Sequence, residues 1–297
     1  MDSPPAIRVL LRTISADFSI QVAGWSIAAL LQTEKVQTDL PTEPIIFYDL
    51  IGSASFIVCT YLSLNKPWAK DEEGLERPLH PRQVLASGTT VIWACYLGSF
   101  LFIRALQYGD KRFDKVKKMP AKLLIYWIVQ GVWVAVTALP VYLTNSIPAD
   151  MHPPIGARDV IGYIFWATGF TFQVLANYQK QQWRKEVGKD YKRSFISHGL
   201  WSLSRHPNYF GECVLWLGSY LFSSSAFPDA VTGQVLPHWM SRLAVFSPIF
   251  VTFLIIRVSG IPLLERENDR RLKDVVAYWK YKKETSMFVP TWPRSVE

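Results

Sequence analysis

The stretch from Trp201 to Glu212, WSLSRHPNYFGE, concentrates residues that can do chemistry. Pro207 favours the first turn of a helix, where its missing N–H is no loss. An apolar run follows, so we expect a helix N-terminus here, whose free N–H groups and positive partial charge suit an anionic ligand. Glu212 lies one turn inside that run. An ionisable side chain inside a membrane-spanning segment is energetically costly, so we treat Glu212 as a candidate functional residue. An ordinary capped helix explains the same residues without a ligand. The polar residues placed at this terminus are Arg205, His206, Asn208 and Tyr209.

A second set of polar residues follows an apolar run at 160–178. If that helix continues, Asn177, Lys180 and Arg184 share one face. The ordinary explanation of this face is the basic flank that membrane spans commonly carry on their cytosolic side.

The third set lies near the end of the chain. A charged segment, 265–271, precedes Tyr278 and Tyr281. Aromatic and basic residues in this arrangement fit either a ligand site or an amphipathic helix at the membrane interface.

The composition indicates that transmembrane helices must position these residues. The chain has 297 residues, of which 49% are hydrophobic and only 19% charged, below the roughly 25% of soluble domains. A span needs about 20 mainly apolar residues. We predict an all-α integral membrane protein with about seven transmembrane helices in a single polytopic domain, 1–297. The predicted spans are 13–32, 45–64, 83–107, 123–145, 160–178, 209–227 and 243–264.

The basic residues of the connections predict the orientation. They concentrate after the third, fifth and seventh spans, which by the positive-inside rule lie in the cytosol. This arrangement predicts an outside N-terminus and a cytosolic C-terminal tail. The three polar sets then all face the cytosol, where dinucleotide cofactors are available.

Several classes of function are disfavoured. Cys59, Cys95 and Cys213 lie in apolar runs with no CxxC pair, so we expect neither a disulfide framework nor a metal site. The net charge of +8 comes from short basic blocks between apolar runs, as expected for loops that touch an anionic leaflet, not nucleic acid. No GxGxxG follows a strand, which excludes a Rossmann-type nucleotide site.

The nine residues SRHPNYFGE, 204–212, resemble the signature of the steroid 5α-reductase and isoprenylcysteine methyltransferase superfamily. The nearest likeness is to its branch of uncharacterised membrane proteins with a steroid-reductase-like C-terminal domain. The likeness covers about four-fifths of the chain, with the reductase-like part at about 120–292. It also includes the segments YDLIG (48–52), GSFLF (98–102), RFD (112–114) and SGIPLLE (259–265).

The second set, NYQKQQWR at 177–184, is similar to the N-x-Q-K-x-x-F-R element of sterol double-bond reductases, with Trp183 in place of Phe. The branch named above more often has Asp where Asn177 stands. In the sterol reductases the residues matching Lys180 and Arg184 contact the phosphates of NADPH. The aromatic and basic tail is similar to the family's cytosolic ending.

The resemblance implies a membrane reductase that uses NADPH to reduce an activated C=C bond of a sterol, steroid, terpenoid or other lipid. Glu212 and Tyr48, which lies next to Asp49, are the candidate catalytic residues. The endoplasmic reticulum membrane is the expected location in a eukaryote. The residues expected to hold the cofactor are Asn177, Lys180, Arg184, Arg205, His206, Asn208, Tyr209, Tyr278 and Tyr281.

Two other functions remain open on sequence grounds. Methyltransferases that use S-adenosylmethionine carry a related RHPxY element, but that methyl donor has no phosphates for Lys180 and Arg184 to bind. A non-catalytic lipid-binding membrane protein is the second alternative. The retained intramembrane Glu212 disfavours it, because a site without function has no reason to keep a costly charge.

Overall fold

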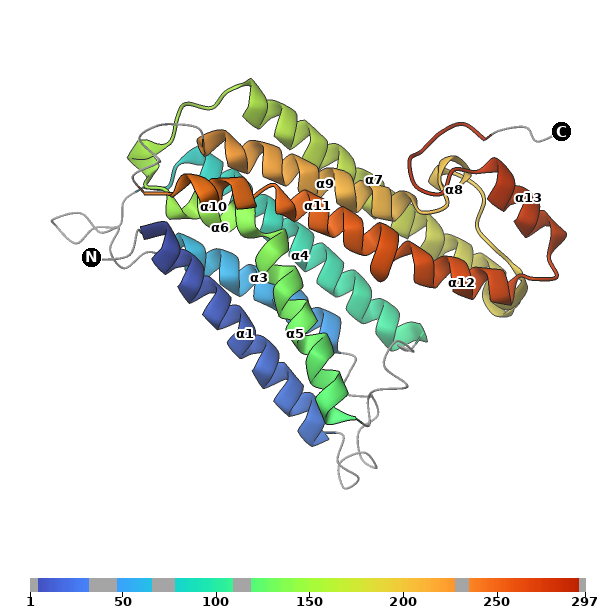
Figure 1. Ribbon diagram of the computed structural model, residues 1–297. Coiled ribbons are helices and arrows are strands. Elements are labelled where there is room, and N and C mark those ends of the chain that lie inside the picture. Colours follow the sequence, from blue (N-terminus) through green and yellow to red (C-terminus); the bar gives the residue numbers. More distant parts are fainter. Residues whose placement is uncertain (1–4, 32–46, 66–77, 109–118, 228–234, 294–297) are drawn as a thin grey trace. The chain divides into compact units, whose positions relative to one another are not determined.

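The computed structural model describes residues 5–31, 47–65, 78–108, 119–227 and 235–293, and in these ranges the regular structure is helical, with no strand. Figure 1 shows the helices. The predicted all-α class is confirmed for this part of the chain. The chain divides into two compact units. Unit 1 comprises residues 1–159 and 222–247, and unit 2 comprises residues 160–221 and 248–297.

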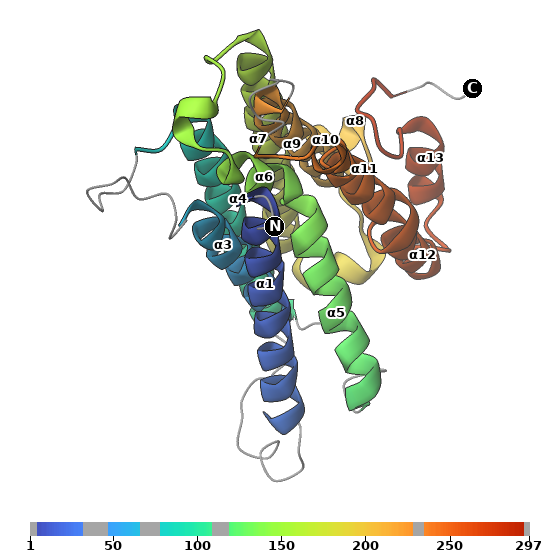
Figure 2. The same ribbon diagram turned by 60° about the vertical axis from the view of Figure 1, so that its left-hand side comes forward.

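Unit 1 is a bundle of helices around an aromatic core. Helix α1 packs against α3 and α5, α3 packs against α4, and the short α6 packs against α1, α3 and α4 (Figures 1 and 2). Phe56 contacts the rings of Trp93 and Trp133 edge-on, with centroids 5.0 and 4.8 Å apart. The elements are α1 (Pro5–Leu31), α3 (Tyr48–Leu64), α4 (Pro81–Tyr108), α5 (Pro120–Thr137), α6 (Leu139–Ser146), α10 (His238–Leu243) and the 3-10 turns Ala149–Met151 and Ser224–Ala226.

Unit 2 is built around a close contact between α7 and α9. A Cβ on Gly211 would lie 2.5 Å from the Gly169 oxygen, and one on Gly218 would lie 2.4 Å from the Trp166 nitrogen. Only glycine permits backbones to approach this closely. The elements are α7 (Ala157–Val187), α8 (Leu200–Leu203), α9 (Pro207–Ser223), α11 (Phe246–Phe253), a π-helical turn (Leu254–Val258), α12 (Ile261–Arg271) and α13 (Val276–Glu284).

Among the residues that the structure describes, four helical stretches are long and apolar enough to cross a membrane, and they overlap the predicted spans 83–107, 123–145, 160–178 and 243–264. They are Pro81–Gln107, Pro120–Thr137, Ala157–Val187 and His238–Arg271. The predicted spans 13–32, 45–64 and 209–227 coincide with α1, α3 and α9. The total of seven spans and the cytosolic tail stay predictions.

The predicted span 123–145 is wrong in one respect, because the helix is interrupted at Ala138. Helix α5 ends at Thr137, and α6 begins at Leu139 with Pro140 in its first turn. A proline inside a helix lacks an N–H donor and its ring clashes with the carbonyl of the residue four positions earlier. The π-helical turn similarly interrupts the last span.

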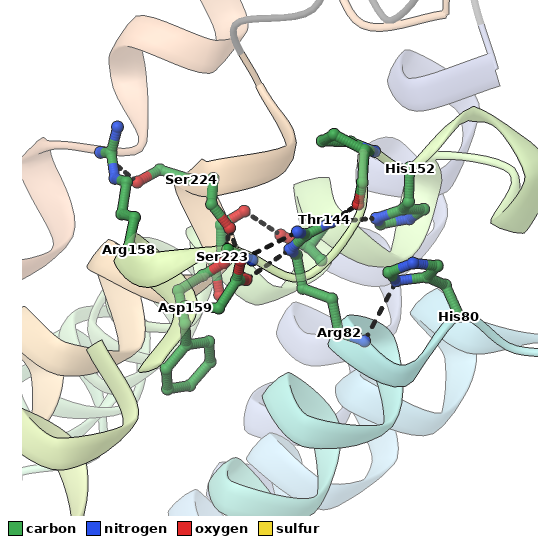
Figure 3. Close-up of polar contacts among 12 residues, drawn as sticks. His80, Arg82, Thr144, His152, Arg158, Asp159, Ser223 and Ser224 are labelled. Carbon is green, nitrogen blue, oxygen red and sulfur yellow. Dashed lines mark hydrogen bonds and ion pairs between the residues drawn. The ribbon is translucent and has the colours of Figure 1, made fainter. Parts of the chain in front are cut away.

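A buried ion pair fixes one end of unit 1 (Figure 3). Arg82 Nε and Nη2 donate to Asp159 Oδ1 and Oδ2 at 2.6 and 3.0 Å, and the two side chains are 1% and 3% exposed. Arg82 also donates to the carbonyls of Pro153 and Pro154 and to His152 Nδ1. Ser225 Oγ and the Gly156 N–H donate to the Asp159 carboxylate. The pair therefore joins the start of α4, residues 153–159 and residue 225.

Candidate functional site

The polar segment before α9 is held by the last part of the chain. Ser204 has extended backbone, and its Oγ accepts from the His206 N–H and donates to the Phe288 carbonyl at 2.8 Å. The Arg205 N–H donates to the Ser286 carbonyl, and the Thr291 N–H donates to the Leu203 carbonyl. Residues 286–291 thus fix the N-terminus of α9, which begins at Pro207 as predicted.

Glu265 of α12 brings three cationic or basic groups together. Its Oε1 lies 2.8 Å from His206 Nε2, and its Oε2 lies 3.3 Å from Arg205 Nη2 and 3.0 Å from Lys282 Nζ. Lys282 also forms a short contact with Asp269. The predicted residues Arg205 and His206 therefore share one network. Glu265 and Lys282 were not predicted as site residues, although Glu265 ends the family-like segment SGIPLLE.

The two predicted tyrosines of the tail bind other parts of unit 2 through their hydroxyls. Tyr278 donates to Asp269 Oδ1 at 2.8 Å, and Tyr281 donates to the Trp201 carbonyl at 2.6 Å. Phe195 contacts both rings. Burial raises the pKa of both hydroxyls, and the hydrogen bond to Asp269 raises that of Tyr278 further. Both tyrosines are therefore protonated donors that hold α13 in place.

Trp201 connects α7 to this network. Its indole N–H donates to the Ala176 carbonyl at 3.0 Å, and Lys180 Nζ lies 4.5 Å from the centre of its ring, a cation–π contact. The ring belongs to a buried cluster with Ala176, Trp183 and Ile196. The positive charge of Lys180 also contributes to lowering the pKa of His206. Of the second predicted set, Asn177 is buried and Arg184 is half-buried on the same helix.

Glu212 has a partner on α7 that the sequence did not indicate. Gln173 Nε2 donates to Glu212 Oε2 at 3.2 Å, and Gln173 is buried. The glycine contact brings the two side chains together, because Gly211 meets the backbone of Gln173. The second candidate catalytic residue, Tyr48, lies in unit 1, where its hydroxyl donates to the Tyr126 carbonyl at 2.7 Å. The segment 112–114 lies outside the described residues.

Two buried atoms at the N-terminus of α9 lack a hydrogen-bond partner within the described ranges. They are Arg205 Nε, a donor, and Asn208 Oδ1, an acceptor. A buried polar atom without a partner costs about 1–3 kcal/mol. Since a donor and an acceptor are both left without a partner beside this network of ion pairs, the terminus can bind a ligand that carries both hydrogen-accepting and hydrogen-donating groups. Tyr209 adds an aromatic face, with its ring stacked 5.9 Å from that of His206.

We expect His206 to make the protein less stable in mild acid. Burial lowers the pKa of His206, although the hydrogen bond to Glu265 opposes the shift. Below the unfolded value of about 6.5, the unfolded chain binds a proton that the folded chain does not, so stability falls as pH decreases through that value. Melting temperatures between pH 7.5 and about pH 5 should show a smaller fall for His206→Gln. An unchanged pH profile in this variant would contradict the assignment.

Comparison with known proteins places this site in a family. A family model described as "Protein of unknown function (DUF1295)" matches residues 42–285. An uncharacterised protein of Schizosaccharomyces pombe is 28% identical over 137 residues, which cover 40% of this chain and 38% of that relative. The chain thus spans well under half of the relative's length. No solved structure matches the chain. Since the family model matches most of the sequence, including every candidate site residue, the chain belongs to the DUF1295 family.

Proposed function

We propose that the protein is an integral membrane reductase that uses NADPH to saturate an activated C=C bond of a sterol, steroid, terpenoid or other lipid. The observation that carries the proposal is the N-terminus of α9. Arg205 and Lys282 both pair with Glu265 there. Two buried atoms beside these pairs, Arg205 Nε and Asn208 Oδ1, have no hydrogen-bond partner among the described residues. The resemblance of SRHPNYFGE to the steroid-reductase superfamily supports the choice of cofactor.

The groups at this terminus fit a phosphorylated dinucleotide. Its phosphate oxygens would accept hydrogen bonds from Arg205 Nε and from the free backbone N–H groups at the N-terminus of α9. Its amide and hydroxyl groups would donate to Asn208 Oδ1. Lys180, whose ammonium lies over the Trp201 ring, supplies further positive charge beside this segment. Arg184, on the same helix α7, is the other residue expected to bind a phosphate. The charge of Lys282 is balanced by Glu265 and Asp269. When bound, NADPH supplies the hydride, and the protein supplies position and electrostatics.

Saturation of a C=C bond also requires a proton, which we assign to Glu212. Asn208 and Glu212 are four residues apart on α9, so they lie on the same helix face. The Gln173 amide holds the Glu212 carboxyl in position by donating to Oε2. A carboxyl held within one turn of the ligand-binding terminus can deliver a proton to the carbon opposite the hydride. Tyr48 remains the second candidate donor.

The membrane arrangement belongs to the same proposal. We infer seven spans formed by α1, α3, α4, α5 with α6, α7, α9, and α10 to α12. The basic blocks then lie in the cytosol together with α13. In a eukaryotic cell the endoplasmic reticulum membrane would give an apolar substrate access from the bilayer and the dinucleotide access from the cytosol.

Binding of NADPH to detergent-purified protein tests the proposal. A ligand at 100 times its dissociation constant stabilises the folded state by about 2.7 kcal/mol. We expect the melting temperature to rise with NADPH, and the rise to be lost in Arg205→Ala and Asn208→Leu. Lys280→Ala is the matched control, because Lys280 is 73% exposed on α13.

S-adenosylmethionine and NADH, measured alongside, distinguish the alternatives. A rise with S-adenosylmethionine alone would replace the reductase by a methyltransferase. No rise with any of the three ligands would favour a non-catalytic lipid-binding protein. A rise with NADPH that persists in Arg205→Ala and Asn208→Leu would move the cofactor away from the N-terminus of α9.

A further inference from the structure

A histidine caps the N-terminus of α4, a position where Ser, Thr, Asn or Asp is usual. His80 Nδ1 accepts from the Arg82 N–H at 3.2 Å, and Gln83 Oε1 accepts from the His80 N–H at 3.0 Å. These reciprocal bonds have the arrangement of a capping box. Histidine is the side chain whose charge ordinarily changes between pH 5 and 8, so the cap of α4 can respond to pH.

A second histidine is stacked on the first. The rings of His80 and His152 are nearly parallel, with centroids 4.6 Å and planes 8° apart (Figure 3). His152 Nδ1 lies 3.2 Å from Arg82 Nη1. Because an arginine nitrogen can only donate, His152 accepts through Nδ1, as His80 does. Both rings are therefore neutral in this arrangement, since a protonated imidazole carries a hydrogen on each nitrogen.

The charges around the two rings disfavour a proton on either. Arg82 is 1% exposed, and its guanidinium contacts both His152 and Asp159. The N-terminus of α4 adds a positive partial charge at His80. Burial and the charge of Arg82 lower the pKa of His80, and the charge of Asp159 offsets only part of that shift. The remaining charged residues of segments 78–82 and 149–159 are exposed, and they are Asp150 and Arg158.

We propose that His80 and His152 form a pH-sensitive latch at one end of unit 1, closed when both rings are neutral and loosened by a proton on either. A proton on His80 Nδ1 removes the acceptor of the Arg82 N–H and with it the cap of α4. A proton on His152 Nδ1 removes the acceptor of Arg82 Nη1 and places a cation beside a buried guanidinium. Because Arg82 joins α4 to residues 153–159, the loss of either bond loosens the junction of these segments.

The proposed membrane arrangement gives the latch a side. The connections before α4 and before α7 lie opposite the basic blocks, so both face away from the cytosol. The latch would then loosen when the compartment on that side becomes acidic. This placement rests on the topology proposed above, whereas the latch rests only on contacts within unit 1 and does not depend on reductase activity.

Hydrogen exchange of the detergent-purified full chain, compared at pH 7.5 and about pH 5.5 and corrected for the intrinsic effect of pH on exchange, tests the latch. Below the unfolded value of about 6.5, the open form binds a proton that the closed form does not. An opening that takes up one proton therefore becomes about tenfold more favourable for each further pH unit of acid. We expect this rise in exchange in residues 78–84 and 149–159, and no such rise in α3 or α5.

His80→Asn is the most informative variant, because asparagine caps helices well and does not titrate. It should keep native exchange at pH 7.5 and lose most of the response to acid, and adding His152→Gln should abolish the response. His238→Gln removes an exposed histidine of the same unit and is the matched control, which should respond as the native protein does. A response that the double variant retains would overturn the proposal. The native protein alone can also overturn it, through exchange that is independent of pH or that rises equally throughout unit 1.

Discussion

Replacing Gly211 by alanine should destabilise the protein by about 1–3 kcal/mol, the usual cost of forcing atoms into a packed core. The added Cβ would lie 2.5 Å from the Gly169 oxygen and 2.7 Å from the Gln173 nitrogen. Both are backbone atoms, so no side chain can rotate away and α7 and α9 must separate. Chemical denaturation in detergent measures the loss. Because Gln173 then moves from Glu212, the variant should also lose the proposed reductase activity.

Gly88→Ala provides the matched control for this prediction. Gly88 lies on an exposed face of α4, and a Cβ there would meet nothing within 4 Å. Alanine in a helix is more favourable than glycine by about 0.5–1 kcal/mol, so this variant should be slightly more stable. If Gly211→Ala were as harmless as Gly88→Ala, the close packing of α7 and α9 would be wrong.

Arg82→Ala should cost about 3–5 kcal/mol, the typical loss when one partner of a buried ion pair is removed. The substitution leaves the Asp159 carboxylate buried without its guanidinium. It also removes the donors to the Pro153 and Pro154 carbonyls. Figure 3 shows that these contacts connect several separate segments of unit 1. We expect a large fall in melting temperature and little soluble protein at 37 °C.

Two controls separate the charge effect from the loss of packing. Lys273→Ala removes a partner from an exposed pair, 72% and 85% exposed, and should change stability by less than about 1 kcal/mol. The double substitution Arg82→Met with Asp159→Leu should recover much of the loss, because no charge is left unpaired. A double variant as unstable as Arg82→Ala would show that packing, not the unpaired charge, causes the effect.

The features that the sequence predicted correctly depend on local chemistry. The start of α9 follows from Pro207, because the fixed backbone angle and missing N–H of a proline suit the first turn of a helix. The four longest apolar stretches follow from composition over about 20 residues. The break at Ala138 also has a local signal, since Pro140 lies within the predicted span, although the uncharged run 123–145 by itself predicts one continuous helix.

The partners of the site residues could not be predicted in this way. Glu265 is 59 residues from His206, and Gln173 is 39 residues from Glu212. Their pairing depends on how whole helices pack, which hydrophobic periodicity does not specify. The glycines that set the α7–α9 contact are visible in the sequence, but a glycine in a helix does not reveal which helix it meets.

The contacts of residues 286–291 with residues 203–205 have a consequence for biosynthesis. Ser286, Phe288 and Thr291 supply the backbone groups that hold Leu203, Ser204 and Arg205. During translation, α9 emerges from the ribosome about 80 residues before these partners, at ordinary speeds several seconds earlier. The nascent chain therefore contains α9 before the groups that hold the N-terminus of this helix have been synthesised. A chain that stops before residue 286 lacks the backbone groups that hold Leu203, Ser204 and Arg205.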